Sequence, residues 1–84
     1  MRLPSKETVE MLRRQYPAGT LVELIEMKDP YSQLRPGDRG RVVWVDDAAG
    51  IHVAWSNGEG LAAIWGEDFI RKVPDQATDE GALE

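Results

Sequence analysis

Hydrophobic and polar residues follow two different periods along this chain, one helical and one extended. Between Ser5 and Tyr16, apolar side chains recur with the spacing i, i+3 and i+7, which places them on one face of an α-helix. Ser5 is a typical N-cap residue, and Pro17 forces the residue before it out of helical geometry. The pattern predicts one amphipathic N-terminal helix over about residues 5–15.

After Gly19 the period changes to two, which is typical of a strand with one buried and one solvated face. Val22 and Leu24 alternate with a glutamate in the first predicted strand. The clearest alternation in the protein comes later, in the run IHVAW at residues 51–55. We expect its three larger apolar side chains to form the core: Ile51, Val53 and Trp55.

The strand predicted over residues 41–47 has two apolar faces, so its orientation stays open. Val42 and Trp44 share one face, and Val43 and Val45 share the other. A β-bulge in the middle of the strand would shift this register. The facing of the tryptophan therefore does not follow from the alternation.

Turn-forming residues separate the strands. The long loop 28–40 contains Asp-Pro and Pro-Gly dipeptides and is expected to include one tight helical turn at residues 30–34. Asn57-Gly58 predicts a tight primed hairpin turn that leads into a fourth strand over residues 60–65. Residues 67–73 then offer a short closing strand or turn. Four or five short strands at this spacing predict a mainly β fold, a small antiparallel barrel with one helix packed against it.

The charge of the chain is unevenly distributed. The formal net charge is −5, but four of the 15 acidic residues lie in residues 75–84, which leaves 11 acidic against 10 basic residues in residues 1–74. We predict one domain over residues 1–74 and a disordered acidic tail over 75–84, whose final Leu-Glu resembles a cloning scar. No apolar run approaches bilayer length, so we expect a soluble, cytoplasmic protein that does not enter membranes.

Nearly the whole chain except the acidic tail resembles a small bacterial family catalogued as domain of unknown function 4314. The resemblance rests on the N-terminal helix, Asp29-Pro30-Tyr31, Pro36-Gly37, the strand at Ile51-His52-Val53 and Trp55 with Asn57-Gly58. It implies an SH3-like barrel, sometimes found in mobile-element or phage neighbourhoods, and it brings no established activity and no catalytic residues. The glycine-valine start of the second strand also resembles that of KOW-type barrels in ribosomal and transcription proteins.

A cluster of arginines surrounds the Pro36-Gly37 turn. The run from Gly37 to Gly40 matches the GxxG spelling of a nucleotide-clamping loop, but that clamp lies between helices, and here a β-branched run follows. The segment is therefore interpreted as a turn that feeds a strand. Three arginines within seven residues still form a candidate phosphate-binding patch: Arg35, Arg39 and Arg41.

Three tryptophans in 84 residues are informative, because tryptophan is costly to expose and often anchors interfaces. Trp55 belongs to the core by its period. Trp44 and Trp65, together with Tyr31, are candidates for an aromatic platform that stacks bases or receives a proline-rich or extended peptide. Core packing of both tryptophans is the competing interpretation.

Catalytic and metal chemistry have little support in this sequence. The chain has one histidine and no cysteine, so neither a thiolate nor a histidine-cluster zinc site can form. His52 is interpreted as a surface residue that hydrogen-bonds Asp46 or Asp47, and no nucleophile accompanies it. We therefore expect no enzymatic activity, no cofactor and no metal.

Two functions follow as hypotheses. In the first, the protein is a monomeric or weakly dimeric adaptor that binds a protein or peptide through Tyr31, Trp44 and Trp65. In the second, it is a nucleic-acid or nucleoprotein accessory protein that contacts phosphates through its three clustered arginines.

Overall fold

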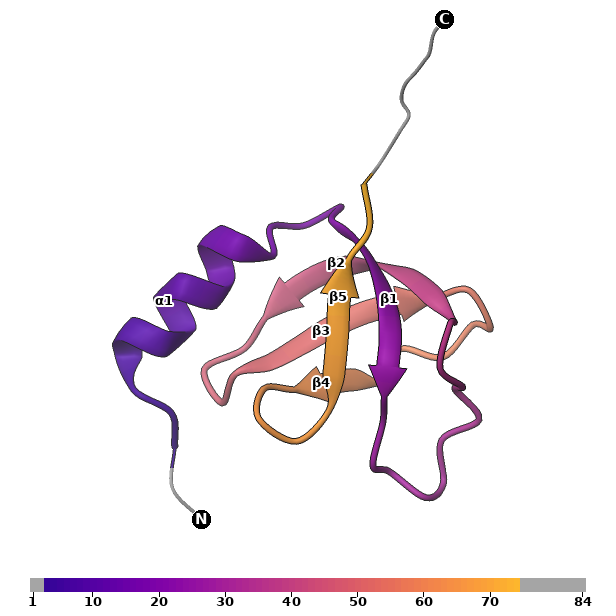
Figure 1. Ribbon diagram of the computed structural model, residues 1–84. Coiled ribbons are helices and arrows are strands. Elements are labelled where there is room, and N and C mark those ends of the chain that lie inside the picture. The colour runs from indigo at the N-terminus through magenta and orange to yellow at the C-terminus, as the bar shows by residue number, and fades with distance from the viewer. Residues whose placement is uncertain (1–2, 75–84) are drawn as a thin grey trace, which may run out of the picture.

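One helix is followed by five antiparallel strands in a single sheet (Figure 1). The computed structural model describes residues 3–74. Its elements are α1 (Lys6–Gln15), β1 (Leu21–Glu26), β2 (Arg39–Val45), β3 (Gly50–Trp55), β4 (Ala62–Ile64) and β5 (Phe69–Lys72). This confirms the predicted mainly β class with an N-terminal helix. The predicted acidic tail lies outside the described residues.

Helix α1 begins and ends where the sequence indicates. The Ser5 hydroxyl accepts a hydrogen bond from the Thr8 N–H at 3.1 Å and so satisfies one of the free amides of the first turn. Val9 and Leu12 on the apolar stripe are buried. At the other end, the Arg13 guanidinium donates to the Val45 carbonyl at 3.0 Å, which ties the helix to the end of β2. No helix in residues 3–74 is long and apolar enough to cross a membrane.

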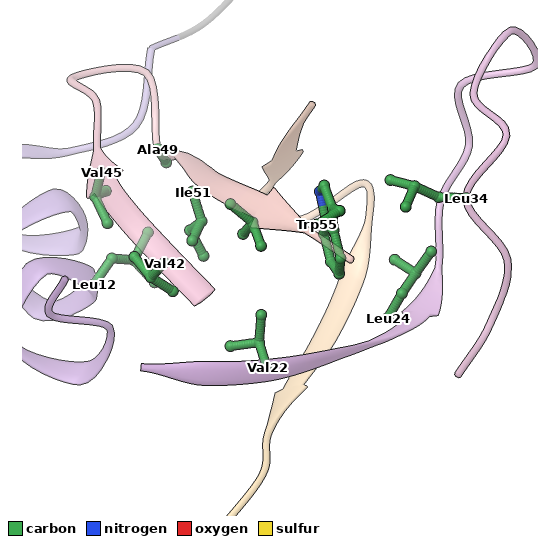
Figure 2. Close-up of a cluster of buried hydrophobic side chains, with 10 residues drawn as sticks. Leu12, Val22, Leu24, Leu34, Val42, Val45, Ala49, Ile51 and Trp55 are labelled. Carbon is green, nitrogen blue, oxygen red and sulfur yellow. The ribbon is translucent and has the colours of Figure 1, made fainter. Parts of the chain in front are cut away.

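The core lies inside the curved sheet (Figure 2). Buried strand residues match the predicted alternation: Val22 and Leu24 in β1, and Ile51, Val53 and Trp55 in β3. Leu12 from α1 and Leu34 from the long loop pack against this cluster from opposite sides. Leu34 was not expected in the core, because a loop position has no period that marks it.

A bulge in β2 settles the facing of Trp44. The pairing of β2 with β3 shifts between Val42 and Trp44, so the alternation changes phase at Val43. Val42 and Val45 are buried as a result, and Val43 and Trp44 are 53% and 54% exposed. Both Val43 and Trp44 therefore face solvent, a combination that a regular strand cannot produce.

Two predicted turns are wrong in type. Residues 30–34 form no helix; the chain reverses in one tight turn in which the Ser32 N–H donates to the Asp29 carbonyl at 3.2 Å. At the β3–β4 hairpin only Gly58 has a positive φ, of 93°, whereas a type I′ turn would also need one at Asn57. The Asn57 side chain instead accepts a hydrogen bond from the Glu59 N–H at 2.9 Å, which stabilises a turn with an ordinary φ at the asparagine.

Strands β4 and β5 stand at the two ends of the strand order β4-β3-β2-β1-β5, and the sheet curls so that one side chain links β4 to the segment after β1. Asp68 lies in the turn between them. One of its carboxylate oxygens accepts from the Ile64 N–H of β4 and the other from the Lys28 N–H that follows β1, both at 2.9 Å. The last two strands are thereby held in place beside the rest of the sheet.

Candidate functional site

The six residues predicted to bind a partner are all exposed, and the structure places them in three segments. Tyr31 and Arg35 lie in the long loop before β2, and the tyrosine side chain is 92% exposed. Trp65 follows β4. The remaining three lie on the outer face of β2: Arg39, Arg41 and Trp44.

Two arginines of the outer face flank one carboxylate. Glu23 of β1 pairs with Arg39 of β2 on one side and with Arg71 of β5 on the other. Its Oε1 atom lies 3.2 Å from Arg39 Nη2 and 2.9 Å from Arg71 Nη2. Arg41, one pleat further along β2, donates from Nη1 to the Gly19 carbonyl at 2.9 Å. The patch therefore holds three arginines and one glutamate, and Arg71 is the member that sequence reasoning missed.

Arg35 lies apart from this cluster. Its backbone N–H donates to the Asp38 carboxylate at 2.9 Å, which closes the Pro36-Gly37 turn. The turn interpretation of this segment is thus confirmed, with a positive φ of 98° at Gly37.

Trp44 stacks on His52 on the outer face, beyond the arginines. The ring centroids are 4.5 Å apart and the planes differ by 13°. His52 Nε2 lies 2.7 Å from Asp46 Oδ2, as the sequence suggested, and this contact orients the imidazole under the indole. One face of an exposed tryptophan is thereby fixed against the sheet.

Asp46 organises the turn between β2 and β3. Its Oδ1 atom accepts from the N–H groups of Ala48 at 2.9 Å and Gly50 at 2.8 Å. Burial alone would raise the pKa of the Asp46 carboxyl, but the hydrogen bonds from Gly50, His52 and Ala48 outweigh burial and hold the pKa below its usual 3.8. The ionised form is therefore the one that the fold stabilises.

This depressed pKa predicts an acid-dependent loss of stability. The stabilisation from ionised Asp46 is fully present well above pH 3.8 and is lost as the pH falls through the lower, folded-state pKa. The free energy of unfolding of wild type should therefore exceed that of Asp46→Asn at neutral pH, and the difference should shrink as acid is added. Urea unfolding from neutral to strongly acidic pH measures this. Asp47→Asn is the control, because it removes only an exposed ion pair with Arg13 and should change the free energy of unfolding little. A pH-independent gap for Asp46→Asn would contradict the prediction.

Trp65 stands between two apolar hollows at the open end of the sheet. The first is a cleft of about 330 Å³, which we call the Trp65 cleft, lined mainly by Tyr16, Ala63, Trp65, Phe69 and Ile70. The second, of about 420 Å³, lies on the N-terminal side and is lined mainly by Leu3, Pro4, Ala48, Ala49, Ile64 and Trp65. Trp65 and Phe69 are each 46% exposed. The structure thus presents a partly open aromatic pair beside space that a side chain can enter.

The turn after β4 holds Trp65 in this position. The Trp65 N–H donates to the Ala49 carbonyl at 3.0 Å, and the Ile64 carbonyl accepts from the N–H groups of Glu67 and Asp68. Gly66 has a φ of 93°, a left-handed conformation that glycine adopts without strain. The backbone of Trp65 is therefore held by hydrogen bonds in a short turn and does not belong to a long loop.

The chemistry of the Trp65 cleft is almost wholly apolar. Asp68 is its charged lining residue, and both of its oxygens already accept backbone hydrogen bonds. Burial raises the pKa of the Tyr16 hydroxyl above its ordinary value of 10.0, so this group stays neutral at physiological pH. Sequence reasoning assigned Tyr16 and Phe69 to packing and missed their place in the cleft, because only the path of β5 brings them beside Trp65.

Comparison with known proteins adds a family to this description. The family model described as domain of unknown function (DUF4314) matches residues 5–73. The chain belongs to this family. The match confirms the resemblance inferred from the helix and the turn dipeptides, and it covers every helix and strand of this DUF4314 protein. No curated protein and no solved structure matches the chain.

Proposed function

We propose that this DUF4314 protein is a non-enzymatic binding module that takes an apolar side chain of a partner protein into the Trp65 cleft. The observation that carries the proposal is Trp65 itself, an indole 46% exposed at the mouth of an apolar cleft. Tryptophan is enriched among the residues that dominate interface energies, and it acts best beside a pocket that excludes water.

The surroundings of Trp65 support a protein ligand. Ile64, Trp65 and Phe69 are exposed within six residues, and Leu3 adds a fourth apolar side chain across the N-terminal hollow. Such a group of exposed apolar residues is typical of interaction sites. The cleft volume of about 330 Å³ lies at the lower end of the range for ligand pockets, which suits one or two side chains.

The curl of the sheet also supports a finer description of the fold. We propose that the five strands form a variant of the SH3-like barrel, in which Asp68 links β4 to the chain after β1. The Trp65 cleft then lies between the first and last strands of the sheet order.

A matched pair of tryptophans tests the proposed function. Peptides selected from a random displayed library on the wild-type protein should bind Trp65→Ser about tenfold more weakly or worse, because the indole supplies the apolar wall of the cleft. Trp44→Ser is the control, since Trp44 has similar exposure but lies on the outer face of β2. Fluorescence anisotropy with labelled peptides gives the affinities. Equal binding by wild type and Trp65→Ser, or a failure to select any peptide, would refute the proposal.

A second candidate function rests on the Trp44–His52 stack. An indole fixed flat on a sheet can stack a nucleobase, and Arg39, Arg41 and Arg71 lie on the same face for phosphates. The Glu23 carboxylate among these arginines weakens the local positive potential, which is why we rank this function second.

Nucleic-acid binding has a different experimental signature. We expect the affinity for labelled single-stranded DNA or RNA to fall steeply with added salt, because phosphate contacts release counterions. Trp44→Ser should weaken binding about tenfold, as expected for the loss of one stacked base, and Trp65→Ser should not. Absence of binding at low salt, or equal losses in both variants, would exclude this function.

A further inference from the structure

The outer edge of β5 carries backbone groups that the sheet leaves unpaired. In an antiparallel pair, residues alternate between pointing their N–H and C=O at the partner strand and pointing them away. The Val73 N–H donates to the Leu21 carbonyl at 2.9 Å, so in the register of β1 and β5 the pair Glu23 and Arg71 is also hydrogen-bonded. It follows that the backbone groups of Ile70 and Lys72 point away from β1.

The hydrogen bonds on the other side of β1 confirm this alternation of inward and outward backbone groups. The Leu24 N–H donates to the Asp38 carbonyl, and the Leu24 carbonyl accepts from the Gly37 N–H, each at 2.8 Å. Leu24, the partner of Ile70, therefore directs its backbone towards β2 and not towards β5. Within residues 3–74, the outward amide and carbonyl of Ile70 make no hydrogen bond with another element of the fold.

Ile64, which borders the cleft on β4, is by contrast capped. Trp65 donates to Ala49, so the pairing of β3 with β4 leaves Ile64 pointing outwards. The Ile64 N–H donates to the Asp68 carboxylate, and its carbonyl accepts from Glu67 and Asp68. At the Trp65 cleft, therefore, the outward backbone groups of Ile64 are satisfied, whereas those of Ile70 are open.

We propose that the partner segment binds as an added β-strand along the outer edge of β5, with an apolar residue in the Trp65 cleft opposite Ile70 and acidic residues at the adjacent positions. The inference rests on the proposed function and specifies the ligand of the same site. Strand addition gives affinity through main-chain hydrogen bonds and specificity through pockets for alternate side chains. Ile70 offers both: its backbone N–H and C=O point outwards, and its side chain lines the Trp65 cleft.

Charge on β5 indicates which residues flank the apolar one. Side chains next to the inserted residue lie on the opposite face of the added strand, beside Arg71. The Arg71 guanidinium already donates to Glu23 at 2.9 Å but has five N–H donors in all, so it can also donate to a second carboxylate. Opposite charges on neighbouring strands stabilise the pair. An extended segment in which apolar and acidic residues alternate is therefore the matching ligand.

The features that flank this edge protect it from unselective pairing. Strand β5 has only four residues and carries Arg71 and Lys72, and short cationic edges resist aggregation. The Lys72 Nζ atom lies 2.7 Å from Gln15 Oε1 and 5.4 Å from the centre of the Tyr16 ring, which places the end of α1 beside the end of β5. The added strand is thereby limited to a short segment centred on Ile70.

A second copy of the chain is the competing occupant. In the register that pairs Ile70 with Lys72 of the other copy, Arg71 would lie directly opposite Arg71, and like charges in that position destabilise the pair. The register that pairs Ile70 with itself sets Arg71 beside Phe69 and avoids this repulsion. Acidic residues of a different partner would instead attract Arg71, which is why we favour a different protein as the ligand.

The experiment uses the full chain and defined peptides. The probe is an acetylated, amidated heptapeptide with a central leucine, in which valine and glutamate alternate on either side. Its analogue carries an N-methyl group on the amide expected to donate to the Ile70 carbonyl, and a second analogue replaces glutamate with lysine. NMR titration at millimolar peptide should shift the Ile70 and Lys72 amides and the Trp65 indole N–H. We expect N-methylation to weaken binding roughly tenfold, the loss of one main-chain hydrogen bond.

The outcomes separate this inference from the proposed function. Binding that shifts Trp65 but is insensitive to N-methylation overturns strand addition and leaves the Trp65 cleft as the site. Absence of any shift at Ile70 and Lys72 also overturns it, while peptides selected from the library still test the cleft. Preference for the glutamate peptide over the lysine peptide, lost in Arg71→Gln, supports the proposal that acidic residues of the partner lie beside Arg71. Sedimentation of the free protein as a dimer that the peptide does not dissociate would assign the edge to a second copy.

Discussion

Replacing Trp55 with alanine should destabilise the fold by about 3–5 kcal/mol, the range for truncating a large aromatic residue in a core. Trp55 is 4% exposed and faces the inside of the sheet (Figure 2). Its indole Nε1 donates to the Leu61 carbonyl at 2.8 Å, so the substitution removes a hydrogen bond as well as packing. A loss of this size is comparable with the whole stability of a small domain. The variant should therefore be largely unfolded in dilute buffer.

Trp44→Ala is the matched control for Trp55→Ala, because it removes the same side chain from a site that is 54% exposed. It should cost only about 1 kcal/mol, the value of one aromatic stack, here that with His52. Urea unfolding followed by circular dichroism measures both variants. Equal destabilisation by the two substitutions would show that the core is not centred on Trp55.

Gly40→Ala is expected to have the second largest effect, because β2 and β3 come close together at this position. A Cβ atom on Gly40 would lie 2.6 Å from the Ala54 carbonyl oxygen, 2.6 Å from Val53 Cγ1 and 2.9 Å from the Trp55 Cα. Two of these three atoms belong to the backbone of β3, so the methyl group cannot be accommodated by a rotamer change. The strands must separate, and we expect a loss of about 1–3 kcal/mol or more, as for an overpacked core.

Gly60→Ala provides the control for Gly40→Ala. A Cβ atom on Gly60 would meet nothing within 4 Å, and its φ lies outside the left-handed region. The substitution should change the free energy of unfolding by no more than about 0.5 kcal/mol. Thermal and urea unfolding of both variants and of wild type measures the two changes in the free energy of unfolding. A Gly40→Ala protein as stable as Gly60→Ala would contradict the close approach of the two strands.

Local patterns were sufficient for the helix and for the clearest strands. Helix α1 is bounded by a capping serine and a proline, both of which act within one turn of their own position. In β3 every second residue is large and apolar, so only one register can bury the set. These elements could be predicted because the physical cause lies within the segment itself.

The candidate site could be predicted only in part. Trp65 was correctly singled out, but Phe69 and Tyr16, which line the cleft with it, come from β5 and from the residue that follows α1. Arg71 joins the outer cluster because β5 pairs with β1, some 48 residues away in the chain. No hydrophobic period or motif within either strand indicates that β1 and β5 pair. Tyr31 and Arg35, singled out with Trp65, belong to a loop that lies apart from the cleft.

The sequence by itself determined the mainly β class, the extent of α1 and the burial of Ile51, Val53 and Trp55, because hydrophobic periodicity and capping are local properties. Only the tertiary structure decided that a bulge turns Trp44 outwards and that the edge of β5 lies open beside the Trp65 cleft. These features depend on hydrogen bonds and contacts between strands that are distant in the chain. Their geometry arises when the sheet curls and β5, the last strand of the chain, pairs with β1, the first.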